Sequence, residues 1–544
     1  MEPRSMECDE PIEVTSGIQA TEDNEVVEPQ VCGRPRTPPP QPIVHVEVCL
    51  TRGSTASRDA VCQAVGMHLR TKQGTCNLPA LWEHVFVGTS SSEQTFFNEN
   101  IASIGLSTED TDCPLGRESV TQTAVHLETA PLVYHVYRLV SGDEADPTHE
   151  TLEVSSEVIR GGTRWALPSS AFDGLWDTLV YDSSVKRDLL KYAESALLFA
   201  DYEVSQHVIA WNRVIFLHGP PGTGKTSLCR ALAHKLSIRL SHRFTSAALI
   251  EINTVNLMSK WFSESARLVS QMFSSIFEYI EDPNHLVFLL VDEVESLTAV
   301  RKSVASACEP SDALRVVNAV LTHLDQLKHY SNVLVMATSN VTGVVDPAFL
   351  DRADIRAYIG PPSAVAIYSI YASCLNELIR VGLIERQKSG LLNYRVLSAL
   401  QFVESSVTAP SLAVWRLAQR SVGLNGRALR KLPLLAHAFH MDSKYHPGQV
   451  PLLGNRWVAN NADSENVSPP QASISGSERN ASSAVPLSVF VEALQRAVDC
   501  RFSDQRFTAE YMGESKSGAR IKGADSGSPP GANSTTSSVV VNFT

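Results

Sequence analysis

An octapeptide at positions 219–226, Gly-Pro-Pro-Gly-Thr-Gly-Lys-Thr, constrains the fold of this chain more than any other feature. It fits the pattern G-x-x-x-x-G-K-[ST], in which the backbone N–H groups surround a phosphate and the lysine faces the β- and γ-phosphates. An apolar run precedes it, and helical apolar spacing follows at 226–236. This context favours a phosphate site at a helix N-terminus over a chance turn. We therefore predict that ATP, with Mg²⁺, binds to Gly219, Pro220, Pro221, Gly222, Thr223, Gly224, Lys225, Thr226 and Ser227.

Two acids follow the next apolar run of strand length. Residues 286–291 are all apolar, and Asp292 and Glu293 come directly after them. In a parallel sheet of this kind, the C-terminal end of such a strand lies beside the phosphate-binding loop. We predict that Asp292, mostly through water, and the Thr226 hydroxyl hold Mg²⁺, and that Glu293 polarises the attacking water.

Polar residues after a third apolar run extend the candidate site. Asn340 is placed to orient a water against the γ-phosphate, although Asn is also common where turns begin. Arg352 and Arg356 lie shortly beyond it. An arginine there can reach the γ-phosphate of a neighbouring subunit, which increases the hydrolysis rate strongly. The alternative for Arg352 is an ion pair with Asp351 or Asp354, and the role of Arg356 is left open.

Hydrophobic patterning predicts the fold class. Apolar runs of strand length alternate with helical segments, which implies a parallel sheet and an α/β core. These runs lie at 213–218, 286–291 and 333–337, with amphipathic helices at 182–198 and 487–512. Strand patterns at 43–50 and 132–140 indicate a separate α+β domain. The predicted order is a disordered acidic and Pro-rich tail (1–42), the α+β domain (43–155), the large α/β domain (165–360), a helical domain (361–512) with a polar insert (456–486), and a disordered tail (513–544).

Composition excludes several classes of protein. The net charge is −13, and residues 1–42 contribute nine acids against three arginines, so the sequence indicates no large basic surface for DNA. No apolar stretch is long enough for a membrane-spanning helix. The ten cysteines form no C-x-x-C pair, which favours free thiols over a zinc site. We therefore expect no membrane segment and no direct contact with nucleic acid.

The order of these motifs resembles that of the AAA+ ATPases. Longer segments resemble the pachytene checkpoint protein 2 family, called thyroid hormone receptor interactor 13 in animals, and the resemblance covers residues 43–512. The segments that carry it are WDTLVY at 176–181, IN at 252–253, SKWFSES at 259–265, DEVESL at 292–297, EPSDALRVVN at 309–318, DRAD at 351–354 and GRALRKLP at 426–433.

The resemblance implies a homohexameric ring that uses ATP hydrolysis to remodel HORMA-domain proteins. In the family, the substrates are HORMA proteins of the spindle checkpoint and of the meiotic chromosome axis, and a HORMA-like adaptor delivers the former. Remodelling converts a closed, partner-bound form to an open one or extracts it from its complex. The resemblance also implies that the domain at 43–155 binds substrate and adaptor, and that the protein acts on chromosomes in the nucleus, with the cytoplasm as a second location.

The resemblance also assigns further site residues. Lys260, Trp261 and Phe262 match the pore loop of AAA+ rings, where an aromatic side chain offers broad apolar contact to a peptide of any sequence; a buried core tryptophan is the alternative. A second pore loop is expected at 299–309. Arg427 matches the sensor-2 arginine of the lid domain. Arg352 matches the first finger arginine, whereas Ile355 occupies the usual second position.

Two other readings remain open. One is an AAA+ DNA-loading or initiator machine, which the acidic balance and the lack of a basic recognition module disfavour. The other is a binding scaffold with an inactive ATPase site. The intact set of predicted site residues argues against inactivity, because loss of activity usually removes one of them. A membrane-bound AAA protease is excluded, since the chain has no H-E-x-x-H motif.

Overall fold

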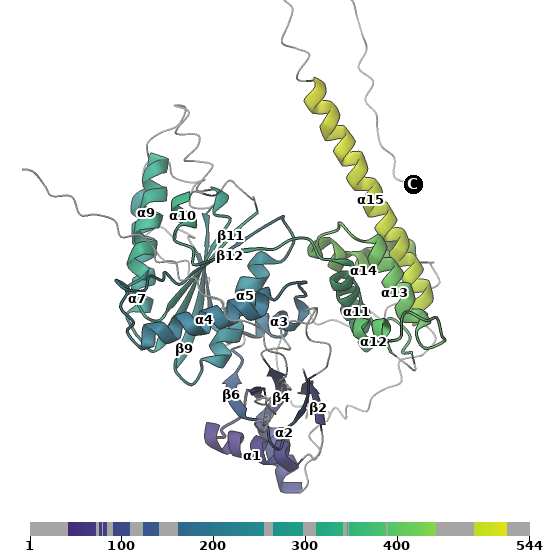
Figure 1. Ribbon diagram of the computed structural model, residues 1–544, viewed down its shortest axis with the longest axis horizontal. Helices are drawn as coiled ribbons and strands as arrows, with labels where there is room; N and C mark the ends of the chain where they lie inside the picture. Colours follow the sequence, from purple (N-terminus) through teal and green to yellow (C-terminus); the bar gives the residue numbers. More distant parts are fainter. Residues whose placement is uncertain are drawn as a thin grey trace, which may run out of the picture. The chain divides into compact units, whose positions relative to one another are not determined.

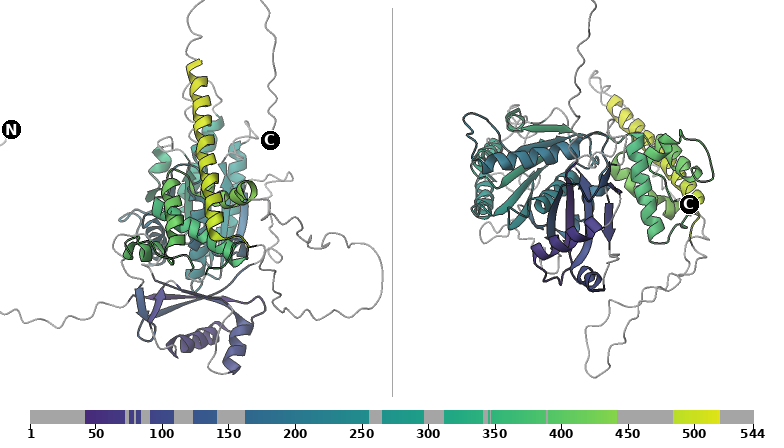
Figure 2. Two further views of the ribbon diagram at one scale, coloured as in Figure 1. Left: turned by 90° about the vertical axis from the view of Figure 1, so that its right-hand side faces the viewer. Right: turned by 60° about the horizontal axis from the view of Figure 1, so that its bottom comes forward.

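The computed structural model describes residues 42–71, 75–78, 80–83, 91–108, 123–140, 162–254, 265–296, 312–340, 345, 347–387, 390–441 and 484–518. Figures 1 and 2 show their helices and strands. The predictions for residues 1–41, for most of the polar insert, for both pore loops and for residues 519–544 lie outside the described part of the chain.

The first folded part of the chain is an α+β domain, as the strand patterns predicted. Its main sheet has the order β3-β4-β1-β6, in which β1 pairs antiparallel with β4 and parallel with β6. Valines 44, 46 and 48 of β1 are fully buried on one face, where they pack with helix α1. The elements are β1 (Val44–Leu50), α1 (Arg58–Thr71), β2 (Thr75–Leu78), β3 (Ala80–Glu83), α2 (Ser91–Asn100), β4 (Ile101–Thr108), β5 (Thr123–His126) and β6 (Leu132–Arg138).

The α/β core is a six-stranded sheet of order β12-β8-β11-β10-β9-β7 with helices on both faces (Figure 1). Five strands are parallel, which confirms the predicted fold class, and β7 pairs antiparallel with β9 at one edge. Helices α7 and α9 cover one face, and α3, α4 and α5 cover the other. The elements are β7 (Gly162–Leu167), η2 (Ser170–Phe172), α3 (Leu175–Thr178), α4 (Val185–Asp201), β8 (Val214–His218), α5 (Lys225–Arg239), β9 (Ser246–Asn253), α7 (Ser265–Ile280), β10 (His285–Asp292), α9 (Asp312–Leu327), β11 (Val333–Ser339), α10 (Pro347–Leu350) and β12 (Ile355–Tyr358).

Three strands of this sheet were not predicted from the sequence. β7 starts at Gly162, before residue 165, where the large domain was expected to begin. β9 begins with Ser246, and Glu251 interrupts its apolar run. β12 is a short edge strand whose residues alternate between half-buried and exposed. Edge strands are less apolar than central ones, so sequence patterning detects them poorly.

The helical domain has its own core around Tyr368, Tyr371 and Phe490. Helix α15 has 32 residues and continues past residue 512 to Gly518 (Figure 2), so part of the predicted C-terminal tail is helical. A single interior Gly513 costs only about 1 kcal/mol of helix stability, and helix-favouring residues surround it. No helix in the described residues is long and apolar enough to span a bilayer. The elements are α11 (Ala364–Arg380), α12 (Tyr394–Ala399), α13 (Ala409–Arg420), α14 (Gly426–His440) and α15 (Leu487–Gly518).

Candidate active site

The phosphate-binding loop connects β8 to α5 and requires glycine at defined positions. Gly219 has φ of +146°, and a Cβ there would overlap the carbonyl oxygen of Ile359. Gly224 has φ of +95°, and its Cβ would lie 2.9 Å from the hydroxyl oxygen of Tyr181. Left-handed backbone and close packing exclude other residues at both positions. The loop therefore holds its backbone N–H groups at the N-terminus of α5, which suits an anion.

Lys225 begins α5 and points back into the loop. Its Nζ donates hydrogen bonds of 2.8 Å to the carbonyl oxygens of Gly219 and Pro220. Burial lowers the pKa of Lys225, the carboxylates of Glu295 and Asp292 act against that, and the cation of Arg427 lowers it further. These contacts keep the ammonium group on the concave side of the loop, where the β- and γ-phosphates of a nucleotide would lie.

Asp292 sits at the end of β10 against the start of α5. The Thr226 hydroxyl donates to its Oδ1 over 3.1 Å, and the Thr338 hydroxyl of β11 donates to the same oxygen. Oxygen donors are the ligands that Mg²⁺ prefers, and this ion usually takes only one or two protein ligands besides water and phosphate oxygens. The pair formed by Thr226 and Asp292 fits Mg²⁺ in its chemistry. No group of three or more metal-binding side chains occurs in the described residues.

Glu293 follows Asp292 directly, in the turn after β10, and its backbone is strained. Its φ of +59° is left-handed, which is rare for a residue other than glycine and costs about 1–3 kcal/mol. The Thr254 hydroxyl fixes the turn by donating to the carbonyl oxygens of Asp292 (2.9 Å) and Glu293 (2.8 Å). Burial raises the pKa of Glu293, and the charges of Asp292 and Glu295 raise it further. A carboxylate of raised pKa is a better base toward water.

Glu295 and Asn340 are linked across the ends of neighbouring strands. The backbone N–H of Asn340 donates to Glu295 Oε1 over 3.1 Å. Asn340 was predicted from the sequence, whereas Glu295, Thr254 and Thr338 were missed. Glu295 could have been found, because it is the second acid in the segment Glu-Val-Glu at 293–295, directly after β10. The two threonines left no signal in the sequence, because their roles depend on strand register.

A cavity of about 650 Å³ adjoins the loop on the side of the helical domain. Asn425, the N-cap of α14, donates from Nδ2 to the carbonyl oxygen of Pro221 over 3.1 Å. The backbone N–H of Arg427 donates to the carbonyl oxygen of Gly222, also over 3.1 Å. Two segments therefore meet here that are about 200 positions apart in the chain. The cavity is lined by predicted residues Gly222, Thr223, Gly224, Ser227 and Arg427, and by Leu179, Val180, Tyr181, Asp182, Ser183, Tyr358, Ile359, Gly360, Pro361, Pro362, Ile370, Gly426, Arg430 and Lys431.

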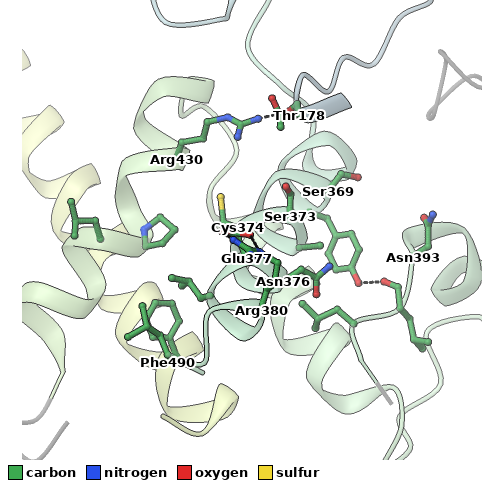
Figure 3. Close-up of a pocket in the computed structure, with 18 of the residues that line it drawn as sticks. Thr178, Ser369, Ser373, Cys374, Asn376, Glu377, Arg380, Asn393, Arg430 and Phe490 are labelled. Atoms are coloured by element: carbon green, nitrogen blue, oxygen red, sulfur yellow. Dashed lines mark hydrogen bonds and ion pairs between the residues drawn. The ribbon is translucent and has the colours of Figure 1, made fainter. Parts of the chain in front are cut away.

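A second cavity, of about 1010 Å³, lies within the helical domain (Figure 3). None of the predicted site residues lines it. Arg430 lines both cavities and donates to the carbonyl oxygen of Thr178, at the end of α3 (Figure 3). Arg430 thus connects the helical domain to the α/β core beside the nucleotide-sized cavity.

The two candidate finger arginines lie apart from that cavity. Arg352 forms a bidentate ion pair with Asp325 of α9, with distances of 3.0 Å from Nε to Oδ1 and 2.6 Å from Nη2 to Oδ2. The ion pair of the alternative reading therefore exists, but its partner is Asp325 and not Asp351 or Asp354. Asp354 instead accepts hydrogen bonds from Tyr192 and Asn212. Arg356 is exposed on β12 and donates to the carbonyl oxygen of Leu350 over 2.6 Å. Neither arginine lines the cavity of its own chain.

Three regions of the chain match known families. Residues 39–142 match the TRIP13 N-terminal domain, residues 215–361 match the ATPase family associated with various cellular activities (AAA), and residues 363–449 match the TRIP13-like AAA+ ATPase lid C-terminal domain. The pachytene checkpoint protein 2 homologs of Rattus norvegicus and Homo sapiens are 46% and 45% identical over 402 residues, which is 74% of this chain and 89% of each relative. The structure of C. elegans PCH-2 is similar with a TM-score of 0.60 and 28% identity, covering 85% of this chain and all of that one.

Proposed function

The chain belongs to the pachytene checkpoint protein 2 family of AAA ATPases and is an ATP hydrolase, and on that premise we propose that it remodels HORMA-domain proteins. Hydrolysis would convert a closed, partner-bound HORMA protein to its open form or extract it from a complex. The observation that carries the proposal is the match of residues 39–142 to the N-terminal domain of this family. That domain lies outside the ATPase core, so the match reaches beyond ATP hydrolysis to the part that would select the substrate.

The geometry of the site suggests how each residue contributes to hydrolysis. Lys225 would face the β- and γ-phosphates from within the loop. Glu293 would accept a proton from the attacking water as its oxygen bonds to the γ-phosphorus and the bond from that phosphorus to the bridging oxygen breaks, which releases ADP and phosphate. The backbone of Asn340 is fixed by Glu295 at the edge of the sheet where that water would be oriented. Arg427 approaches from the helical domain. Mg²⁺ held by Thr226 and Asp292 would neutralise negative charge that develops on the phosphates.

We further propose that the protein works as a homohexamer. The placement of Arg352 supports this, because that residue lies outside the cavity of its own chain yet follows α10 at the edge of the ATPase sheet. In a ring, its guanidinium would leave Asp325 and bind the γ-phosphate of the neighbouring subunit. Lys260, Trp261 and Phe262 would contact the substrate in the central pore.

The proposed setting is the nucleus, on chromosomes, with the cytoplasm as a second location. There the protein would serve meiotic recombination, control of the chromosome axis and spindle-checkpoint signalling, with a HORMA-like adaptor as partner. The net charge of −13 supports a role without direct contact to nucleic acid.

The test is the ATPase rate in the presence of a purified HORMA protein in its closed form, with and without its HORMA-like adaptor. We expect closed protein plus adaptor to stimulate hydrolysis, and the same HORMA protein in its open form to give no stimulation. The Glu293→Gln variant serves as the control for contaminating ATPases. A folded, ATP-hydrolysing protein that responds under none of these conditions would instead favour a DNA-loading machine, and a protein without hydrolysis would favour a scaffold.

A further inference from the structure

A group of four charged side chains, three of them largely buried and the fourth, Glu194, 34% exposed, joins the α+β domain to the helix that carries the phosphate-binding loop. Glu47 lies on β1, Lys235 and Arg239 lie near the C-terminal end of α5, and Glu194 lies on α4. We call these four residues the charge cluster. None of them was singled out by the sequence or belongs to the candidate active site.

Short contacts connect the four side chains. Lys235 Nζ lies 2.6 Å from Glu47 Oε1 and 2.7 Å from Oε2. Arg239 lies between the two acids, with Nε at 3.9 Å from Glu47 Oε1 and Nη1 at 3.3 Å from Glu194 Oε1. The side chains of Lys235, Glu47 and Arg239 are only 10%, 12% and 3% exposed, so water screens these charges little.

The charges of the cluster balance. Burial lowers the pKa of both His135 on β6 and His234 on α5 to about 4, so both imidazoles are neutral near pH 7. Burial by itself would raise the pKa of Glu47, but the cations of Lys235 and Arg239 outweigh it and hold that pKa below its usual value. Two cations therefore face two carboxylates. Removal of Glu47 would leave a buried cation without its partner, which is strongly unfavourable.

Helix α5 connects this cluster to the nucleotide site. The helix starts at Lys225, beside the phosphate-binding loop, and ends at Arg239, in the cluster. It has fifteen residues, about 22 Å of length, and twelve of them are buried. Packed interiors are stiff and transmit strain, so a displacement imposed at one end of the helix would be felt at the other. Just past its end, Arg58 of α1 donates from Nη1 to the carbonyl oxygen of Ser241 over 3.1 Å. The α+β domain thus holds one end of the helix whose other end binds phosphate.

We propose that Glu47 is a positioning residue for nucleotide binding, and that through α5 it couples the docking of the α+β domain to the occupancy of the ATP site. The coupling is reciprocal by thermodynamic necessity: if docking places the loop for phosphate, then bound nucleotide strengthens docking by the same factor. This goes beyond HORMA remodelling, because it concerns ATP binding alone and holds for any substrate.

The test compares Glu47→Gln with the wild-type full-length protein. The affinity for ADP is measured with a fluorescent nucleotide, and kcat is measured at saturating ATP. We expect binding to weaken at least about fivefold, the low end of typical coupling between sites, with kcat changed far less. Adding Lys235→Met to Glu47→Gln removes the uncompensated cation, and most of the affinity should return. Glu404→Gln is the matched control, because its pair with Arg416 is 65% exposed on both sides and its loss should change nothing.

A second variant and a second measurement cover the case in which Glu47→Gln does not fold. Arg58→Ala loosens the same docking contact without leaving a buried charge, and it should weaken ADP binding in the same direction by a smaller factor. In the wild-type protein, bound ADP should slow amide hydrogen exchange in β1 and α1. A folded Glu47→Gln protein with wild-type ADP affinity would overturn the proposal, as would exchange in β1 and α1 that ADP leaves unchanged.

Discussion

Asn425 offers a sharp test of how the helical domain contributes to nucleotide binding, because its side chain makes two separable contacts. Its Oδ1 accepts the backbone N–H of Ala428 over 2.8 Å, which caps α14. Its Nδ2 donates to the carbonyl oxygen of Pro221 in the phosphate-binding loop over 3.1 Å. Serine can replace the cap but cannot reach the loop, whereas alanine can do neither.

The expected effects follow from these two bonds. Asn425→Ser should lower the free energy of unfolding by only about 0.5–1.5 kcal/mol, the net worth of the bond to Pro221, because serine caps a helix about as well as asparagine. It should weaken nucleotide binding by up to the same amount, or up to about tenfold in Kd, because the phosphate-binding loop loses a bond that positions it. Asn425→Ala should show the same loss of affinity, with a stability about 1 kcal/mol lower than that of Asn425→Ser because the cap is lost as well.

The assay pairs thermal unfolding without nucleotide with titration of a fluorescent ADP analogue. Asn393→Ser is the matched control, because Asn393 caps α12 in the same way, through Oδ1 and the N–H of Arg395, and does not line the nucleotide-sized cavity. Wild-type affinity of Asn425→Ser for nucleotide, with weak binding by Asn425→Ala alone, would contradict a role for the bond to Pro221. In that case the helix cap, and not the bond to Pro221, would carry the effect.

Three further predictions concern the catalytic cycle. Glu293→Gln should still bind ATP but lose about 10²–10⁴-fold in kcat, and near-normal turnover of this variant would exclude Glu293 as the base. In the wild-type protein, the hydrolysis rate should fall on acidification at a pH above the usual glutamate pKa of 4.5, because the pKa of Glu293 is raised. Arg352→Ala should cost less than about 1 kcal/mol of stability, because the side chains of Arg352 and Asp325 are 25% and 40% exposed. When the variant is mixed with wild-type protein, it should lower the ATP turnover of the wild-type subunits. A turnover that is simply the sum of the two separate rates would exclude a finger acting on the neighbouring subunit. Trp261→Ala should keep basal hydrolysis and lose remodelling, and retained remodelling would show that this residue does not hold the substrate.

Strain at Glu293 illustrates a site property that the sequence could not reveal. The pair Asp292-Glu293 after an apolar run predicted two carboxylates at a strand end. The left-handed backbone of Glu293 and the hydroxyl of Thr254 that fixes the turn depend on β9 lying next to β10. Neighbouring parallel strands are joined by long crossover connections, so the pattern within one strand does not reveal which strand lies next to it.

Arg352 makes the same point about ion pairs. If Arg352 formed an ion pair, its neighbours in sequence, Asp351 and Asp354, were the partners considered, but Arg352, which follows α10, reaches Asp325 on α9. Asp354 is used elsewhere, by the hydroxyl of Tyr192 and the amide of Asn212. Sequence proximity predicts charge pairs well within one helix and poorly between elements, because only the fold decides which surfaces meet.

The phosphate-binding loop, the two carboxylates and the α/β class could be predicted from the amino-acid sequence, because these follow from short patterns and from the period of apolar residues along one strand or helix. The contact of Asn425 with Pro221, and the pairing of Glu47 with Lys235 near the C-terminal end of α5, are visible only in the folded protein. The two contacts join residues that are 204 and 188 positions apart in the chain. Their partners are chosen by how whole elements pack, and the free energy of that packing is shared among many residues that no short stretch of sequence contains.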